Sequence, residues 1–284
     1  MSLIRTALMV FAAMSLIVTG DTAGKLMAQG GVAVDPVAPA FIAWSRFAMA
    51  ALILLPLSGM ERGEWRMLTD RRVILRALLI VGGISCILIA LRTEPIGDVF
   101  GAFFIGPVVA YVLAALLLGE LVSPARSALL ALGFAGVMLV VRPGFGMTPG
   151  LGFALLAGTF YGGYLVATRW LAGAFRPRFL LISQLMIGAL VLAPTGIAAL
   201  PADVDLRLVA LVMLSALASA AGNYLLVTVN RVVPAGRVAP LVYTQLIAAT
   251  LAGIVVFGDW PDKLSLIGLA VILFSGLASL RAGR

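Results

Sequence analysis

The chain has 284 residues, of which 62% are hydrophobic and only 11% are charged, and its mean hydropathy is +1.14. Soluble domains carry about 25% charged residues, so this composition excludes an ordinary soluble protein and indicates lipid as the solvent. The net charge of +8 does not indicate nucleic-acid binding, because the basic residues are scattered among short loops. Histidine is absent and Cys86 is the single cysteine, which excludes an intramolecular disulfide, ordinary Cys/His zinc sites and His-based acid–base catalysis. We expect no cofactor and no metal.

The first apolar segment begins close to the first residue. Residues 1–20 resemble a signal peptide, with a basic start, an apolar stretch and then small residues. The same residues also form the first half of a spanning helix that continues to Met27. Because further apolar segments follow at close spacing, we interpret this stretch as a retained helix.

Ten apolar segments follow one another along the chain, each near the ~20 residues that a helix needs to cross the hydrocarbon core. The longest loop, 58–72, is rich in charge and is expected at the membrane interface. The prediction is an all-α membrane protein with ten transmembrane helices. The segments are 4–27, 37–57, 73–91, 96–118, 125–142, 149–172, 178–195, 206–229, 235–257 and 264–281.

The basic residues predict the orientation of these segments, because cytoplasmic loops of membrane proteins carry an excess of Lys and Arg. With a cytoplasmic N-terminus, fourteen basic residues fall on the cytoplasmic side and four on the outer side. Lys25 and Arg46 lie within segments and complete the twenty. We therefore expect both termini in the cytoplasm.

The two halves of the sequence resemble each other. A first repeat alignment places 92–120 over 231–259 without a gap, with six of twenty-nine positions identical. A second repeat alignment, whose offset is smaller by a single position, places the second segment over the seventh. Five segments is an odd number, so equivalent segments cross the membrane in opposite directions. We expect two inverted five-helix repeats, 1–142 and 149–281, an arrangement typical of secondary transporters whose site lies between the halves near the midplane.

Several short motifs occur in the order found in a known family. They are Pro39 and Arg46 in the second segment, Pro107 and LLLGE ending at Glu120 in the fourth, Gly133 and Gly136 in the fifth, and VFGDW in the ninth. In this order the chain is similar to the ten-helix EamA branch of the drug/metabolite transporter superfamily, and most of all to YddG-like aromatic amino-acid exporters. The resemblance implies a bundle around a central cavity in a bacterial inner membrane.

The sequence departs from this family in one place and from its four-helix multidrug relatives in another. Asp259 stands where the family usually has Glu. The four-helix relatives use a midplane acid in their first helix, whereas Met14 occupies that depth here. The second departure disfavours a proton-coupled drug pump.

Arg46 is a permanent charge inside an apolar segment. It lies ten residues after Pro36, or about 15 Å of helix, which places it near the midplane. The second repeat alignment pairs it with Gln184, which is also polar and central. Arg46 either meets a substrate carboxylate or ties neighbouring helices together, and we favour the structural role.

Asp21 and Lys25 are four residues apart in the first segment, so they share a helix face and are expected to pair with each other. Both lie toward the outer end of the segment. An interfacial ion pair is one interpretation, and an outer gate or a titratable acid is the other. Asp98, at a similar depth in the fourth segment, has the same two interpretations.

Aromatic and amide side chains are the candidates for contact with a substrate. Those of the fourth segment recur at i, i+3, i+4, i+7 and i+11 from Phe100, which forms one stripe on a helix. The same stripe also suits packing against lipid or a neighbouring helix. Proline at 107 and 240 is expected to break its helix. The expected substrate-binding residues are Phe103, Phe104, Pro107, Tyr111, Tyr161, Tyr164, Asn223, Tyr243 and Gln245.

These features predict a secondary transporter that exports small metabolites, above all amino acids, by alternating access. A multidrug or cation efflux carrier and a membrane scaffold are the alternatives, and the repeat disfavours the scaffold. No acid–base cluster, phosphate loop or nucleophile motif indicates an enzyme, and no segment resembles a selectivity filter. The expected partners are the small-molecule substrate and the lipid bilayer, and a monomer is compatible with the sequence.

Overall fold

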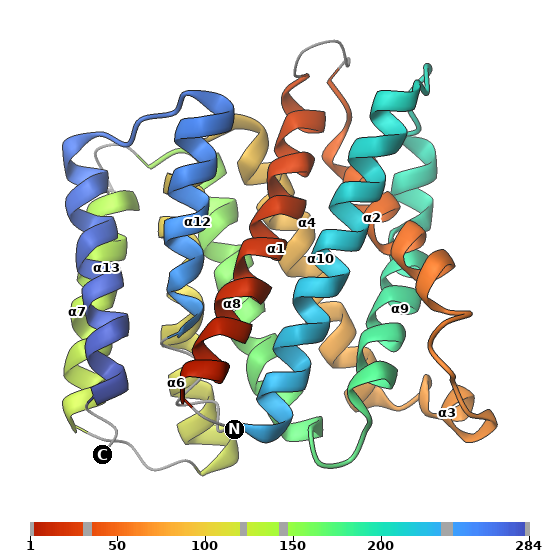
Figure 1. The fold of residues 1–284 in the computed structure, drawn as a ribbon, viewed down its shortest axis with the longest axis horizontal. Coiled ribbons are helices and arrows are strands. Elements are labelled where there is room, and N and C mark those ends of the chain that lie inside the picture. The colour runs from red at the N-terminus through yellow and green to blue at the C-terminus, as the bar shows by residue number, and fades with distance from the viewer. Residues whose placement is uncertain (1–2, 31–35, 120–123, 142–146, 234–240, 282–284) are drawn as a thin grey trace.

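The computed structural model describes residues 3–30, 36–119, 124–141, 147–233 and 241–281. Glu120 and Pro240, singled out above, lie outside these ranges. The described residues form a bundle of helices and contain no strand (Figure 1). The elements are α1 (Leu3–Gln29), α2 (Pro39–Leu54), α3 (Arg62–Met67), α4 (Arg71–Thr93), α5 (Ile96–Phe103), α6 (Ile105–Leu118), α7 (Pro124–Val141), α8 (Pro149–Leu171), α9 (Pro177–Ala198), α10 (Leu206–Val232), α12 (Thr244–Ala252), the π-helical turn η1 (Gly253–Phe257) and α13 (Lys263–Arg281).

The expectation of an all-helical membrane protein is confirmed. Six described helical stretches are long and apolar enough to cross a membrane, and four shorter apolar stretches accompany them. Eight of the ten segments begin and end within three residues of the expected positions. The exceptions are 96–118, which is broken, and 235–257, whose first residues lie outside the described ranges.

Local capping groups mark several of these helix ends. The Thr148 hydroxyl accepts a hydrogen bond from the Leu151 N–H at the start of α8, and the Asp205 carboxylate accepts one from Leu208 at the start of α10. Gly119 ends α6 with φ 65°, and Gly258 ends η1 with φ 69°. The first repeat alignment pairs these two glycines, so both repeats end their fourth segment with a left-handed residue that favours glycine.

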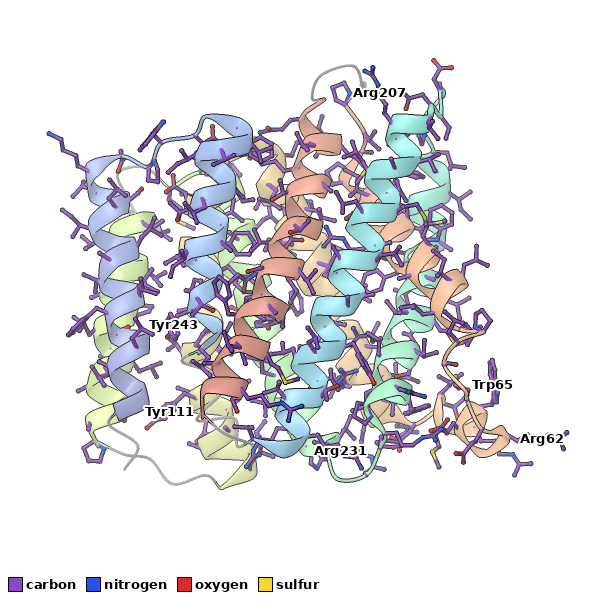
Figure 2. The ribbon with its side chains drawn as sticks, in the orientation of Figure 1. Arg62, Trp65, Tyr111, Arg207, Arg231 and Tyr243 are labelled. Atoms are coloured by element: carbon purple, nitrogen blue, oxygen red, sulfur yellow. The ribbon has the colours of Figure 1, made fainter. Side chains whose placement is uncertain are left out.

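The long loop 58–72 contains α3, which is fixed to the start of α9. Arg176 forms ion pairs of 2.8 Å with Glu61 and 2.7 Å with Glu64. The hydrogen bond from Arg176 holds the pKa of Glu64 below its ordinary value. Figure 2 shows Arg62 at the lower end of the molecule, where α1 also begins and α13 ends. The first and last helices therefore meet the same face of the bundle as α3.

The helix packing pairs one half of the chain with the other. The helix α1 packs along α10, α4 packs along α8, α2 packs along α9 and α7 packs along α13. When the offset of the first repeat alignment, 139 positions, is extended back to residue 71, the alignment also relates α4 to α10. The two helices run in opposite directions. The helix α10 runs from Arg207 at the upper end to Arg231 at the lower end, whereas α4 follows α3 and starts at the lower end (Figure 2). Equivalent helices are thus inverted.

Two equivalent glycines show the same packing in both halves. Gly222 of α10 lies against α1, and a β-carbon there would come within 2.6 Å of the Ala13 carbonyl and touch Ile17. Gly83 of α4 lies against α8 at the Ala157 carbonyl and the Tyr161 N–H. The contacted residues match as well. Ala13 precedes Ile17 by four residues, about one helical turn, and Ala157 precedes Tyr161 by the same number.

The fourth segment is broken at Phe104, between α5 and α6, so the expectation of one continuous aromatic stripe is wrong. Pro107 explains the break, because it has no N–H to donate to the Phe103 carbonyl and its ring would collide with that group. A second break lies at Tyr243, directly before α12. The first repeat alignment pairs Phe104 with Tyr243, and their rings stack with centroids 4.8 Å apart and planes 20° apart. The two helix breaks thus lie at equivalent positions of the repeats, and their side chains contact each other where the two halves of the chain meet.

We expect Gly158→Ala to destabilise the bundle. Gly158 faces the Phe103 carbonyl at the break, and a β-carbon there would collide with that backbone atom. Overpacking of this kind costs about 1–3 kcal/mol. Thermal unfolding in detergent measures the effect, with Gly173→Ala as the control because nothing lies within 4 Å of a β-carbon at Gly173. Equal unfolding temperatures for the two variants would contradict this packing.

Candidate functional site

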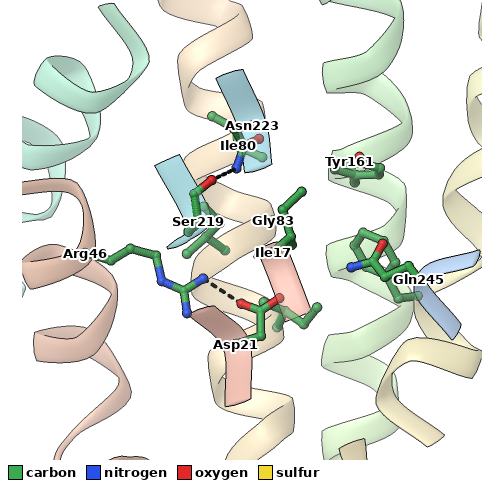
Figure 3. A pocket seen from close by; sticks show the side chains of 12 residues that line it. Ile17, Asp21, Arg46, Ile80, Gly83, Tyr161, Ser219, Asn223 and Gln245 are labelled. Atoms are coloured by element: carbon green, nitrogen blue, oxygen red, sulfur yellow. Dashed lines mark hydrogen bonds and ion pairs between the residues drawn. The ribbon is translucent and has the colours of Figure 1, made fainter. Parts of the chain in front are cut away.

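A cavity of about 40 Å³ lies inside the bundle, with contributions from seven helices (Figure 3). A buried water needs roughly 10–15 Å³, so this conformation has room for about three waters. Pockets for small-molecule ligands measure about 300–1,000 Å³. A metabolite therefore enters only after the helices separate. The lining residues are Ile17, Asp21, Arg46, Ile80, Gly83, Ile84, Ile87, Phe103, Tyr161, Ser219, Asn223 and Gln245.

The polarity of the cavity differs between equivalent helices. The helix α4 contributes Ile80, Ile84 and Ile87, which lie on one helix face. The helix α10 contributes Ser219 and Asn223. The first repeat alignment pairs Ile80 with Ser219 and Ile84 with Asn223. The backbone around the cavity is thus repeated, but its side chains make an aliphatic wall on α4 and a polar wall on α10.

Three polar side chains face this cavity without a partner among the described residues. The Tyr161 hydroxyl and the Asn223 Oδ1 atom are buried and make no hydrogen bond there, and none is found for the Gln245 amide. The Asn223 Nδ2 atom donates to the Ser219 carbonyl at 2.9 Å, which fixes the orientation of the amide. A buried polar atom without a partner costs about 1–3 kcal/mol, so these groups are suited to water or a ligand.

Arg46 ties three helices together at the edge of the cavity. Its Nη1 donates to Asp21 Oδ1 at 2.6 Å, its Nη2 to the Gly20 carbonyl at 2.8 Å and its Nε to the Ser215 hydroxyl at 3.0 Å. These bonds join α2 to α1 and α10. The second oxygen of Asp21, Oδ2, points away from Arg46 (Figure 3) and has no hydrogen-bond partner among the described residues.

The expected ion pair between Asp21 and Lys25 is wrong. Asp21 pairs with Arg46, while Lys25 pairs with Asp259 at 2.7 Å and lies 4.4 Å from the centre of the Phe257 ring. Both residues are also buried, with 3% of Asp21 and 1% of Lys25 exposed, instead of exposed at an interface. Partners from other helices satisfy charges in a low-dielectric interior better than an exposed local pair does. The Lys25–Asp259 pair joins the two halves of the chain.

A second arginine, Arg76, is one of the fourteen basic residues counted above on the cytoplasmic side, and it is fully buried. Its Nε donates to the Thr168 hydroxyl at 2.8 Å, its Nη1 to the Leu180 carbonyl at 2.8 Å and its Nη2 to the Tyr164 hydroxyl at 2.9 Å. The Tyr164 hydroxyl in turn donates to Gln184 at 3.2 Å. Tyr164 and Gln184 thus hold Arg76 and do not line the cavity.

The two arginine clusters are related by the repeat. The first repeat alignment pairs Arg76 with Ser215, and the second pairs Gln184 with Arg46. Each cluster therefore uses the same two positions, but the arginine stands on α2 in one and on α4 in the other. This correspondence is the signal in the sequence that could have identified Arg76.

The other expected site residues lie outside the cavity lining. Phe104 and Tyr243 stack on each other, and Pro107 lies in the first turn of α6. The Tyr111 hydroxyl lies 3.1 Å from the Ser127 hydroxyl of α7. Asp98 lies in the first turn of α5. Of the nine expected substrate-binding residues, the cavity brings together Phe103, Tyr161, Asn223 and Gln245, and sequence reasoning missed the isoleucines and Ser219.

The sequence profile of the EamA-like transporter family matches this chain twice, over residues 4–142 and 148–280. This chain belongs to the EamA-like transporter family. The resemblance to the EamA branch is thereby confirmed, the YddG-like subtype stays a prediction, and the chain is a multi-pass membrane transporter. Among the described residues of this EamA-like transporter, no group of three Cys, Asp or Glu side chains could hold a metal ion.

Two named relatives resemble this EamA-like transporter along most of its length. It is 30% identical to a riboflavin transporter of Rhizobium johnstonii, over 83% of this chain and 76% of the relative. It is 25% identical to an S-adenosylmethionine uptake transporter of Rickettsia bellii, over 82% of this chain and 80% of the relative. One solved crystal structure shares the fold, with a TM-score of 0.67 and 19% identity over 98% of this chain and 97% of the other. Both named relatives carry small metabolites.

We expect Arg46→Ala to lower the stability of this EamA-like transporter by about 3–5 kcal/mol, because it leaves Asp21 buried without its partner. Arg46→Lys removes the planar fork and should recover only part of the loss. The double variant Asp21→Asn/Arg46→Ala should be more stable than Arg46→Ala alone. Size-exclusion profiles and thermal unfolding in detergent measure these differences, with the exposed Arg207→Ala as control. An Arg46→Ala protein as stable as the wild type would show that the hydrogen bonds of Arg46 do not stabilise the packing of α2 against α1 and α10.

Proposed function

We propose that this transporter carries a small organic metabolite through the central cavity by alternating access. The observation that carries the proposal is the convergence of Tyr161, Asn223 and Gln245, none of which has a described protein partner for its cavity-facing group, in one cavity between the two halves. We take 1–142 and 149–281 as the inverted repeats. Carriers built from such repeats expose a central site to each side of the membrane in turn.

The direction and the substrate follow from the relatives and from Arg46. The sequence led us to expect amino-acid export, with Arg46 as one candidate partner for a carboxylate. All three nitrogens of Arg46 already donate to oxygens of the protein, so the geometry gives no support to that contact. One relative is named for riboflavin, and the other is named for uptake of S-adenosylmethionine. Riboflavin has no carboxylate, whereas S-adenosylmethionine has one. We therefore rank uptake of a small heteroaromatic metabolite above amino-acid export.

We assign the Lys25–Asp259 ion pair to the gate at the upper end. Lys25 lies in the last third of α1, and Asp259 follows η1 in the other half. Movement of one half against the other must stretch this contact. Lys25 is 1% exposed and Asp259 is 33% exposed, so breaking the pair leaves a buried ammonium without its partner. The pair therefore stabilises the closed upper end until substrate binding or opening at the other end compensates for its loss.

We place the upper end outside the cell and the lower end in the cytoplasm. The beginning of α1, the end of α13 and the charged helix α3 share the lower end (Figure 1). The excess of Lys and Arg in the loops of that end supports a cytoplasmic location. The proposed setting is a bacterial inner membrane, with a monomer as the transporting unit.

Transport by reconstituted protein tests the carrier function. Vesicles loaded with unlabelled riboflavin should accumulate labelled riboflavin by counterflow, with saturation. Cys86 is the only cysteine, so Cys86→Ser provides a cysteine-free background. In that background, a short, reducible thiol cross-linker between Lys25→Cys and Asp259→Cys should abolish the flux that the double variant shows before treatment, and reduction should restore it. The same treatment should not change the flux of either single cysteine variant. Flux that persists through a complete cross-link would argue against alternating access.

Cysteine labelling tests the orientation. Trp65 is exposed at the lower end, and Arg207 is exposed at the upper end (Figure 2). In intact cells a membrane-impermeant maleimide should modify Arg207→Cys and should leave Trp65→Cys unmodified until the cells are broken. The reverse pattern would invert the assignment of the two ends.

A further inference from the structure

The unpaired atoms around the cavity are mainly hydrogen-bond acceptors. Asp21 Oδ2 and Asn223 Oδ1 can only accept, whereas the Tyr161 hydroxyl and the Gln245 amide can do both. A ligand that satisfies the first two atoms must supply N–H or O–H donors. The unpaired acceptor atoms therefore predict that the ligand presents N–H or O–H donors on the side that faces Asp21 and Asn223.

The charge of the lining disfavours an anion. Among the described residues of the lining, only Asp21 and Arg46 are charged, and they neutralise each other across 2.6 Å. A carboxylate or phosphate in the cavity would lie near the free Oδ2 of Asp21 with no unpaired cation in the lining to compensate it. Burying an uncompensated charge costs several kcal/mol. The Asp21–Arg46 pair thus leaves the cavity suited to an uncharged ligand.

The apolar part of the lining indicates a ring. Phe103 and Tyr161 lie with their ring centroids 5.0 Å apart, beside the three isoleucines of α4. Aromatic side chains favour stacked or edge contacts with a further ring. A flat ligand can therefore place its face on the rings and the α4 wall while its polar edge reaches α10.

The repeat fixes which way the ligand faces. Ile84 and Asn223 occupy equivalent positions on α4 and α10, so a symmetric cavity would have offered the same group from both helices. Only Asn223 of this pair carries an amide. A ligand bound with its polar edge toward α10 therefore differs in energy from the same ligand bound with that edge toward α4. Asn223 thus sets the direction of the polar edge.

On the basis of the transport function proposed above, we propose that the substrate is an uncharged heteroaromatic metabolite. It donates N–H or O–H groups to Asp21 Oδ2 and Asn223 Oδ1, and its ring lies against Phe103, Tyr161 and the α4 wall. Asp21 is a specificity-determining residue, because its free oxygen accepts from this substrate and repels carboxylates and phosphates. The ion pair with Arg46 holds that oxygen in place.

Competition in the counterflow assay tests the charge selectivity with matched pairs. The probes are riboflavin against flavin mononucleotide, adenosine against adenosine monophosphate, and N-acetyltryptophan amide against N-acetyltryptophan, where the first member of each pair is uncharged and the second adds an anionic group. We expect the first member of at least one pair to be carried and to compete at least tenfold more strongly than its anionic partner. If the anionic members are carried with saturation and compete as strongly as the uncharged members or more strongly, the inference is wrong and the carrier function remains. Flux of none of the six probes would count against both.

Two sets of variants test the atoms. Asn223→Ile should weaken competition by the uncharged probe about tenfold, and the swap Ile84→Asn/Asn223→Ile should not recover it, because the acceptor then lies on α4. Asp21→Asn keeps an oxygen for Arg46 and turns the free position into a donor, so it should narrow the difference between uncharged and anionic probes. Thr195→Val, which removes a hydroxyl bonded only within α9, is the control. Unfolding temperatures separate misfolded variants from folded ones.

Recovery of wild-type competition by the swap would show that only the overall polarity of the cavity matters, and would remove Asn223 from the proposal. An unchanged difference between uncharged and anionic probes in folded Asp21→Asn protein would remove Asp21 from it.

Discussion

The ion pair between Arg46 and Asp21 is the contact on which the rest of this molecule depends. A charge inside a membrane bundle is stable only with its partners in place, and Arg46 obtains them from α1 and α10 at once. The same contact closes one side of the cavity and cancels its net charge. One oxygen of Asp21 remains without a partner among the described residues. In the binding mode that we propose, a structural tie and a ligand-recognition group thus share a single carboxylate.

The inverted repeat supplies the backbone of the site, and its departures from symmetry supply the chemistry. The breaks at Phe104 and Tyr243, the left-handed glycines and the close helix contacts occur twice, at equivalent positions. The side chains at equivalent cavity positions differ, with isoleucine on α4 where α10 has serine and asparagine. Two equivalent clusters even place their arginines on different helices. In the alternating-access cycle that we propose, the duplicated backbone lets the two repeats exchange conformations, and the different side chains at equivalent positions favour one ligand over others.

The sequence alone determined the class of the protein, because composition and hydrophobic segment length answer directly to the thickness of a bilayer. Most helix ends were predicted to within three residues, and the motifs identified the EamA family correctly. The repeat was visible because an offset is a property of the sequence. Arg46 was found from its depth in an apolar segment, and its place in a family motif favoured the structural role. Phe103 and Tyr161 were selected because they belong to two aromatic-rich segments, and Asn223 and Gln245 because uncharged amides suit hydrogen bonds to a substrate.

Only the tertiary structure decided which polar groups meet. The rule that residues four apart on a helix interact predicted a pair of Asp21 with Lys25, but partners from α2 and from the loop after η1 took both charges. Arg76 was counted among the cytoplasmic cations because it lies near the start of its segment, whereas α8 and α9 cover it completely. Tyr164 and Tyr111 left the site for the same reason, since their hydroxyls bond across helix contacts. Periodicity gives the face of a helix, but the neighbour of that face depends on contacts between residues far apart in the chain.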